Sequence, residues 1–280
     1  AIILYQKAVR NPKQDASDEL IADITHDIGL CYKKTGIYDS AIVYYKRAKT
    51  LDSLLGRFHK LSDRFRNIGI VYKNQGNYPE AARYYFLGLK ISESYGDSLG
   101  IAKFNDSLGA LFIKQDRDSL AMEYYKLALF QYRIIGNSKD EARILNNIGN
   151  IFENLHLNDS ALSYYRISLN IKEKFDSDSK STNYHNIGTV FLNTGKLDSA
   201  FVYLNRALEL RRYAKEQKDI ATTTLELARY YLLKEDISNA IIRIRAAEQY
   251  ALAQDNQELI MKVHLLKALY YAKSEDYKGA

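Results

Sequence analysis

The 280-residue sequence predicts an all-α protein made of tandem pairs of antiparallel helices. Three observations support this prediction. Proline occurs only twice in the chain, so few positions are closed to helix. Small residues return about every 40 residues, the length of two helices and two short connections. Within each copy the apolar positions are spaced by 3, 4 and 7 residues, which places them on one face of a helix.

Three columns of residues define the repeat. The first column is small: Gly29, Gly69, Gly109, Gly149, Gly188, Ala228 and Ala268. An aromatic residue follows three positions later: Tyr32, Tyr72, Phe112, Phe152, Phe191, Tyr231 and Tyr271. An alanine follows twelve positions after each small residue: Ala41, Ala81, Ala121, Ala161, Ala200, Ala240 and Ala280. We interpret the small residues as points where two helices cross closely, with large aromatic side chains filling the space beside them.

Each copy is predicted to hold a first helix, a short turn and a second helix. Glycine interrupts the pattern at Gly36, Gly76 and Gly195. Residues suited to an N-cap or a first helical turn follow at Asp39, Pro79, Ser119, Asp159, Asp198 and Ser238. We expect Gly56, Gly96 and Gly136 to end second helices in the left-handed conformation.

This register divides the chain into a single repeat array over residues 1–280. We expect residues 1–18 to be the second helix of a truncated repeat, and 258–280 to start a further repeat. The six full repeats between them are 19–58, 59–98, 99–138, 139–178, 179–217 and 218–257. Because helix stacks normally carry polar caps at both ends, we expect the chain to be a fragment of a longer protein, or its ends to dock onto something else.

The 24 tyrosines are explained by the same register. Pairs such as Tyr44–Tyr45 and Tyr84–Tyr85 combine a repeat column with its neighbour, so we interpret them as packing residues and not as a base-stacking surface. Cys31 occupies a column that is apolar or aromatic in the other copies. It is therefore predicted to be a small buried residue and not a nucleophile.

Composition and motifs argue against several classes of function. Forty basic and 34 acidic residues give a net charge of +6, and the basic residues are scattered, unlike those of a dedicated nucleic-acid binder. One cysteine rules out an internal disulfide framework and a multi-cysteine zinc site. The five histidines fall in different copies without metal-ligand spacing. We therefore expect no catalytic site, no metal and no cofactor.

The repeat resembles the tetratricopeptide repeat (TPR). The motif residues appear as Ile68-Gly69-Ile70-Val71-Tyr72, followed by Ala81, Tyr85 and Gly88. The family usually repeats every 34 residues, so the present spacing resembles the branch with repeats of about 40 residues and longer helices. The resemblance covers essentially the whole chain. It implies a right-handed α-solenoid, or superhelix, whose first helices line the concave side.

The first helices supply the candidate binding residues. We expect exposed positions two and three residues before each small residue, and one, four and five after it. Asn67, Asn147 and Asn186 match the column in which, by this resemblance, asparagine grips a peptide backbone. Further candidates for the groove are Asn146, Asn150, Asn74, Asn154, Asn193, Arg66, Lys103, Arg143 and His185. The arginines and the lysine could pair with acidic groups. In the alternative interpretation the asparagines only cap or bridge helices.

The predicted function is a non-catalytic scaffold that binds a protein or an extended peptide. The style of the sequence resembles TPR segments of Bacteroidetes-type signalling and transcription-regulating proteins, which implies a flanking output domain or membrane anchor. That context would be periplasmic in a membrane-anchored sensor and cytoplasmic otherwise. The alternatives are a nucleic-acid-associated regulator, although nucleic acid is not expected to bind through this segment, and a module that self-associates through its ends.

Overall fold

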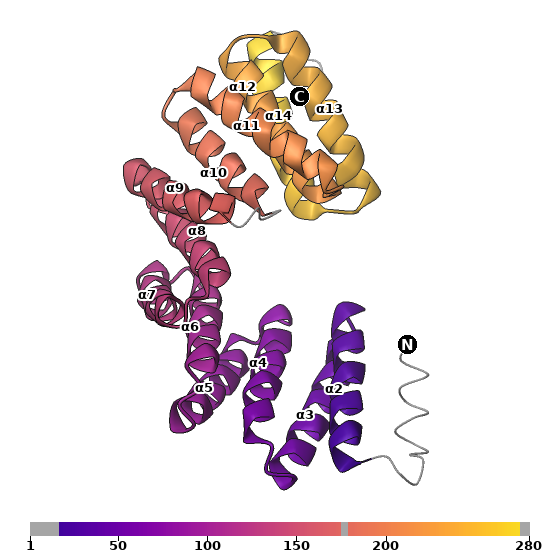
Figure 1. Ribbon diagram of the computed structural model, residues 1–280. Coiled ribbons are helices and arrows are strands. Elements are labelled where there is room, and N and C mark those ends of the chain that lie inside the picture. Colours follow the sequence, from indigo (N-terminus) through magenta and orange to yellow (C-terminus); the bar gives the residue numbers. More distant parts are fainter. Residues whose placement is uncertain (1–16, 175–178, 275–280) are drawn as a thin grey trace. The chain divides into compact units, whose positions relative to one another are not determined.

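The computed structural model describes residues 17–174 and 179–274, and the regular structure in these ranges is entirely α-helical (Figure 1). The helices are α2 (Asp18–Lys34), α3 (Tyr38–Leu54), α4 (Phe58–Asn74), α5 (Tyr78–Ser94), α6 (Ser98–Ile113), α7 (Asp118–Ile134), α8 (Ser138–Asn154), α9 (Asn158–Lys174), α10 (Lys180–Asn193), α11 (Leu197–Tyr213), α12 (Gln217–Leu233), α13 (Ile237–Ala253) and α14 (Gln257–Ser274).

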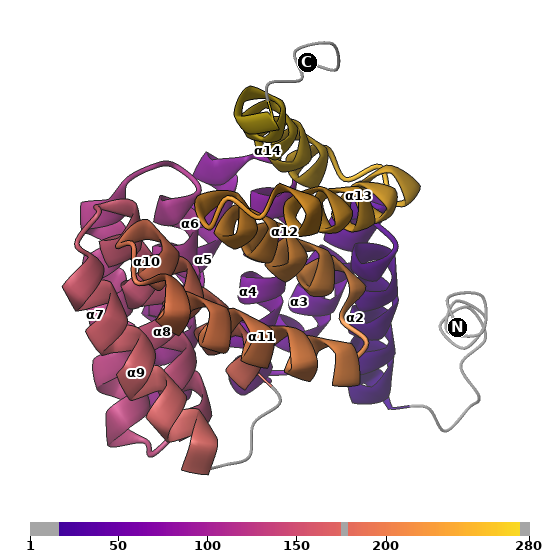
Figure 2. The same ribbon diagram turned by 90° about the horizontal axis from the view of Figure 1, so that it is seen from above.

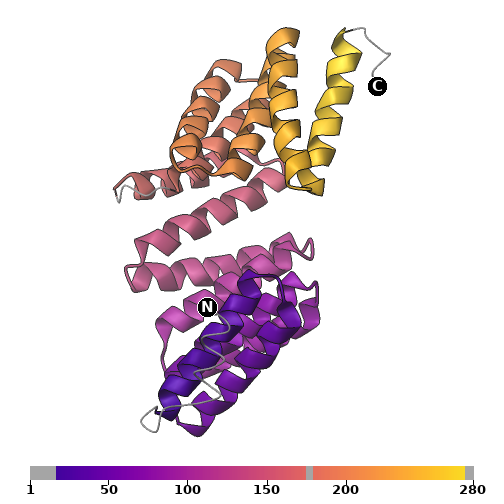
Figure 3. The same ribbon diagram turned by 90° about the vertical axis from the view of Figure 1, so that its right-hand side faces the viewer.

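The chain divides into two compact units, and the boundary between Ile144 and Leu145 falls inside α8. In the first unit α2 packs on α3, α3 on α4, and so on through α7; α4 also contacts α6 (Figure 1). In the second unit the same order runs from α9 to α14, and α12 contacts both α10 and α14 (Figure 2). Figure 3 shows the last two helices, α13 and α14, side by side. Each unit is thus a stack of helix pairs, and the all-α solenoid architecture is confirmed.

The small-residue column lies where the two helices of a pair cross. A Cβ atom added to Gly69 would sit 2.4 Å from the ring of Tyr85, and one added to Gly149 would sit 2.5 Å from the ring of Tyr165. Both distances are too short for a real contact, so a side chain at either position would have to displace the tyrosine. Tyr85 and Tyr165 are fully buried. Glycine is therefore required here because the partner ring occupies the space of a side chain.

The turns adopt the expected left-handed conformation. Gly56, Gly96 and Gly136 have φ between +64° and +67°, as the sequence predicted. Gly36, Gly76 and Gly195 also have positive φ, at the turn inside a helix pair. The same conformation is taken by non-glycine residues in other copies, namely Asp116, His156, Lys215, Glu235 and Asp255. The turn geometry is thus held by the packing of the helices and does not depend on glycine alone.

The aromatic column packs against the second helix of its own pair. Tyr32 stacks on Tyr44, Tyr72 on Tyr84, Phe112 on Tyr124 and Phe152 on Tyr164, with ring centroids 5.2–5.5 Å apart. These contacts confirm that the tyrosine pairs are packing residues. The prediction for Cys31 was only partly right, because its side chain is half-buried and not fully buried.

The division of residues 1–280 into six full repeats and two partial ones remains a proposal. The first helices of the described pairs begin at Asp18, Phe58, Ser98, Ser138, Lys180, Gln217 and Gln257. The proposed first-turn residues, from Asp39 to Ser238, are each the second residue of their helix. Most of the segment assigned to a truncated repeat, residues 1–16, lies outside the described residues, as do 175–178 and 275–280.

Candidate functional site

The candidate residues belong to a row of side chains on the first helices, which we call the first-helix row. It comprises the positions two and three residues before each small residue and one, four and five residues after it, together with Lys103 and Arg143, which lie six residues before Gly109 and Gly149. In the first unit these residues come from α2, α4 and α6, together with the beginning of α8. In the second unit they come from the rest of α8, α10, α12 and α14.

In the first unit, Asn67 links α2 to α4. Its Oδ1 accepts a hydrogen bond from Nζ of Lys33 at 3.0 Å, and its Nδ2 donates to the carbonyl oxygen of Asp63 at 3.0 Å. Asn67 is half-buried. This contact fits the bridging interpretation of the asparagines, because the amide joins two neighbouring first helices.

Arg66 and Lys103 line a common cavity of 250 Å³ between α4 and α6. Its lining also includes Ser62, Asp63 and Asp97. The Nε atom of Arg66 is buried without a hydrogen-bond partner among the described residues. A buried, unpaired donor is costly, so this guanidinium has unused capacity for an acceptor. Of the predicted cationic residues, these two are brought together.

Arg143 does not join that cavity, because it is held by carboxylates. Its Nη2 lies 2.8 Å from Asp106 and 2.9 Å from Asp140. Burial alone would lower the pKa of Arg143, but the contacts with Asp106 and Asp140 outweigh it and raise the pKa above its usual value. An acidic group of a ligand would therefore have to compete with Asp106 for Arg143.

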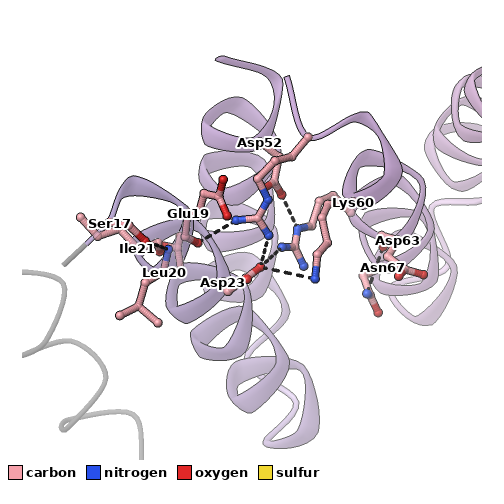
Figure 4. Close-up of polar contacts among 12 residues, drawn as sticks. Ser17, Glu19, Leu20, Ile21, Asp23, Asp52, Lys60, Asp63 and Asn67 are labelled. Carbon is pink, nitrogen blue, oxygen red and sulfur yellow. Dashed lines mark hydrogen bonds and ion pairs between the residues drawn. The ribbon is translucent and has the colours of Figure 1, made fainter. Parts of the chain in front are cut away.

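A buried ion network lies next to the row, and sequence reasoning missed it (Figure 4). Asp52 is completely buried and accepts from Nε of Arg64 at 2.6 Å. Asp23 accepts from Arg57 and from Arg64, each at 2.7 Å, and lies 3.9 Å from Lys60. Burial would raise the pKa of Asp23, but the two arginines lower it below its usual value. The network ties α2, α3 and the start of α4 together.

In the second unit, the row is a network of amides. Nδ2 of Asn186 donates to Oδ1 of Asn146 at 3.2 Å and to Oδ1 of Asn150 at 3.1 Å. The hydroxyl of Tyr165 lies 2.8 Å from Oδ1 of Asn150 and 2.6 Å from Oε2 of Glu153. Burial raises the pKa of Glu153 above its usual value, although the bond from Tyr165 opposes this. Three of the predicted asparagines are thus joined by hydrogen bonds, and Asn150 also bonds the hydroxyl of Tyr165.

Two further contacts extend the row along α10 and α12. Asn193 accepts from Nη2 of Arg229 at 2.5 Å, and Arg229 also lies 3.3 Å from Glu226. Burial raises the pKa of Glu226. His185 lies 3.4 Å from the hydroxyl of Thr223, and burial, with the nearby Arg211, lowers its pKa to about 3. His185 is therefore neutral at neutral pH and can act as an acceptor.

The expectation that the whole row is exposed was wrong at several positions. Asn146 is only 6% exposed, and Ser107, Leu225 and Leu266 are also buried, because neighbouring first helices cover these positions. Asn147 is half-buried. Asn186 and the candidates Arg66, Lys103, Arg143 and His185 are half-buried as well, whereas Asn74, Asn150, Asn154 and Asn193 are exposed. Asn74 and Asn154 are the last residues of α4 and α8.

Several polar residues of the row were not among the predicted site residues. Lys33, Lys73 and Glu153 share the position four residues after the small column. Glu226 and Arg229 flank Ala228. The repeat register could have found all five, because it marks these positions as facing the same side as the asparagines.

The described residues contain neither a cluster of side chains with the chemistry of a metal site nor a helix with the hydropathy of a membrane span. No group of three or more His, Cys, Asp or Glu side chains among them could hold a metal ion. None of the helices in residues 17–174 and 179–274 is long and apolar enough to cross a membrane.

The comparisons with known proteins agree with a fold built from repeated helix pairs. Two models of the tetratricopeptide repeat match residues 140–213 and 22–53. No curated protein matches the sequence. The structure of BtubC from P. vanneervenii is similar, with a TM-score of 0.65 and 22% identity over 78% of this chain and 90% of that one. The Rap conjugation gene regulator of plasmid pLS20, in complex with the Phr* peptide, has a TM-score of 0.66 and 16% identity over 99% and 83% of the two chains.

A longer protein is also similar. The STAND protein PH0952 from Pyrococcus horikoshii, which has a tetratricopeptide repeat sensor, aligns with a TM-score of 0.75 and 15% identity. The alignment covers 99% of this chain and 44% of that one. At these identities the likenesses show the fold alone. Together with the matched repeat models and the helix pairs built on the Gly–Tyr crossings, they show that the chain contains tetratricopeptide repeats.

Proposed function

We propose that this chain is a non-catalytic, protein-binding regulatory scaffold that holds an extended peptide or protein segment along the first-helix row. The observation that carries the proposal is the amide network of Asn146, Asn150 and Asn186, in which side-chain amides are gathered on one side of successive helices. A primary amide has both donor and acceptor capacity, so it can bond a peptide backbone whatever the peptide sequence.

The network leaves hydrogen-bonding capacity for a ligand. Asn150 is exposed, and the contacts of its amide all use Oδ1, so Nδ2 remains available as a donor. Oδ1 of Asn186 remains available as an acceptor, because the contacts of its amide use Nδ2. An extended backbone presents a carbonyl and an N–H at every residue, so it can satisfy both groups.

The similar structures are consistent with this role. One is a Rap regulator in complex with a peptide, and another carries a tetratricopeptide repeat sensor within a signal-transduction ATPase. We propose by analogy that the chain serves as the sensing or regulatory segment of a larger signalling or transcription-regulating protein. Such a protein would add an output domain or membrane anchor outside this segment.

The proposal is tested with a displayed library of random peptides selected on the immobilised chain. Binding of the selected peptides is then measured by fluorescence polarisation with the parent and with the triple variant Asn67→Ala, Asn147→Ala, Asn186→Ala. We expect the triple variant to weaken binding by about tenfold or more, since each lost hydrogen bond contributes roughly 1 kcal/mol.

The matched control is Asn170→Ala, because Asn170 is an exposed asparagine on the second helix α9 and lies outside the row. This variant is expected to bind like the parent. Equal binding by the parent and the triple variant, with helicity preserved in both, would show that the asparagines only bridge helices.

A further inference from the structure

A second cavity in the first unit lies at the turns between first and second helices. It measures 510 Å³ and is lined by Lys73, Asn74, Gln75 and Gly76 at the end of α4, by Tyr38 and Tyr78, which begin α3 and α5, and by Lys114 after α6. Three successive helix pairs therefore contribute to its wall. This volume is within the range of cavities that hold small organic ligands.

The cavity wall carries two positive charges and no carboxylate. Neither Lys73 nor Lys114 forms an ion pair or a side-chain hydrogen bond with any residue in the described part of the chain. Burial, together with the charge of Lys114, lowers the pKa of Lys73 below its usual value. The two ammonium groups thus repel each other across one cavity, and a bound anion would relieve this repulsion.

Two acidic residues that interact with residues of the cavity wall are already engaged. Asp106, which partly offsets the effect on Lys73, lies 2.8 Å from Arg143. Asp39 accepts a hydrogen bond from Nε2 of Gln75 at 2.9 Å. Neither carboxylate lines the cavity.

Neutral donors complete the wall. The hydroxyls of Tyr38 and Tyr78 and the amide of Asn74 form no side-chain hydrogen bond with the described residues, so each is available to a ligand oxygen. A phosphate dianion matches two ammonium groups in charge and offers more acceptor oxygens than a carboxylate does.

A simpler role for the lysines is to neutralise the negative ends of α4 and α6, since Lys73 and Lys114 lie at the C-termini of these helices. Lys34 occupies the equivalent position at the end of α2, so it provides a test of that role. Unlike Lys114, Lys34 does not line this cavity.

We propose that the cavity between Lys73 and Lys114 binds a phosphate group, either free or carried by a phosphorylated side chain. This site lies at the helix turns and does not depend on the peptide-binding proposal. The two lysines contribute the charge, and the tyrosine hydroxyls and the Asn74 amide orient the oxygens.

The test is isothermal titration calorimetry of the chain at neutral pH and low ionic strength. The probes are inorganic phosphate, O-phosphotyrosine and, as a dicarboxylate of similar charge, glutarate. We expect phosphate and O-phosphotyrosine to bind in the millimolar range or tighter, and glutarate about tenfold more weakly. Tighter binding of O-phosphotyrosine than of phosphate would identify a phosphorylated side chain as the ligand, and the reverse order would identify the free ion.

Lys73→Gln and Lys114→Gln are each expected to weaken phosphate binding by about fivefold or more, and the double variant to abolish it. Lys34→Gln is the matched control and should bind phosphate like the parent. Helicity by circular dichroism verifies that each variant is folded. The proposal is overturned if the parent binds no phosphate up to about 10 mM, if glutarate binds as tightly, or if the double variant binds like the parent.

Discussion

The two units place opposite chemistry at the same position of the repeat. The position eleven residues after the alanine column is buried in both. In the first unit it is Asp52, Ser92 and Tyr132 in successive copies, and Asp52 meets the guanidinium of Arg64. In the second unit it is Lys172, Arg211 and Ala251 in successive copies, and Arg211 meets neutral oxygens, namely the Asp219 carbonyl and the Thr223 hydroxyl.

This comparison shows that the packing fixes the burial of a position but not its polarity. A buried charge is tolerated where the next first helix supplies a matching partner twelve or so residues later. Asp52 has a charged partner, whereas the hydrogen-bond partners of Arg211 are neutral dipoles. The energetic cost of removing each residue should therefore differ between the units.

The first and largest expected effect concerns Asp52. Asp52→Ala leaves the buried Arg57 and Arg64 with only the half-exposed carboxylate of Asp23, so we expect a loss of about 3 kcal/mol in the free energy of unfolding. Arg211→Met removes a cation whose hydrogen-bond partners are neutral, and we expect a loss of about 1–2 kcal/mol. Urea unfolding followed by circular dichroism measures both. Equal losses for the two variants would remove the distinction between the units.

The second effect concerns what the units share, the Gly–Tyr crossing. Gly69→Leu and Gly149→Leu force a side chain into the ring of Tyr85 or Tyr165, so each should lose about 3 kcal/mol. Asn154→Leu, at an exposed position of the same helix as Gly149, is the control and should change stability by less than about 0.5 kcal/mol. A tolerated leucine at Gly149, with an unchanged melting temperature, would contradict the crossing geometry.

The third expected effect is a dependence of the free energy of unfolding on pH. Burial lowers the pKa of His26 in the first unit to about 4, and that of His185 in the second unit to about 3. The ordinary pKa of histidine is 6.5, so the unfolded chain binds these protons first as the pH falls. Each histidine then contributes stability that is fully present above pH 6.5 and is lost as the pH falls towards the folded value.

Glu153 and Glu226, which both lie in the second unit, change the stability in the opposite direction as the pH falls. Their raised pKa values mean that the folded chain binds their protons more readily, so their contribution to stability increases as the pH falls towards the ordinary value of 4.5. We expect His185→Gln and His26→Gln each to flatten the decline in urea midpoint below pH 6.5. A decline of unchanged slope in both variants would show that other groups cause it.

The smallest expected effect comes from the amide network. Asn186→Ala removes the bonds to Asn146 and Asn150, so we expect a loss of about 1 kcal/mol in unfolding free energy. Asn154→Ala, whose side chain is exposed, should cost nothing measurable. Equal midpoints for the two variants in urea would show that the bonds of Asn186 make no net contribution.

Much of the fold could be predicted from local pattern. The spacing of Gly149 and Tyr165 identified a close crossing, and Gly56 identified a left-handed helix end, because each depends on steric exclusion by a residue type that the sequence shows directly. The candidate site was less predictable. The row was correctly placed on the first helices, but Asn146 is buried and Arg143 is held by Asp106, since both outcomes depend on the neighbouring helix pair.

The sequence by itself determined the helix pairs, their turns and the aromatic packing, because these follow from residues repeated at fixed intervals along one helix face. Only the tertiary structure decided which polar groups meet. The Asp52–Arg64 pair, the amides around Tyr165 and the unpaired lysines at the turn cavity join residues from different helices. Their contacts depend on side-chain orientation and on how one helix pair stacks on the next, and no periodicity in the chain encodes these.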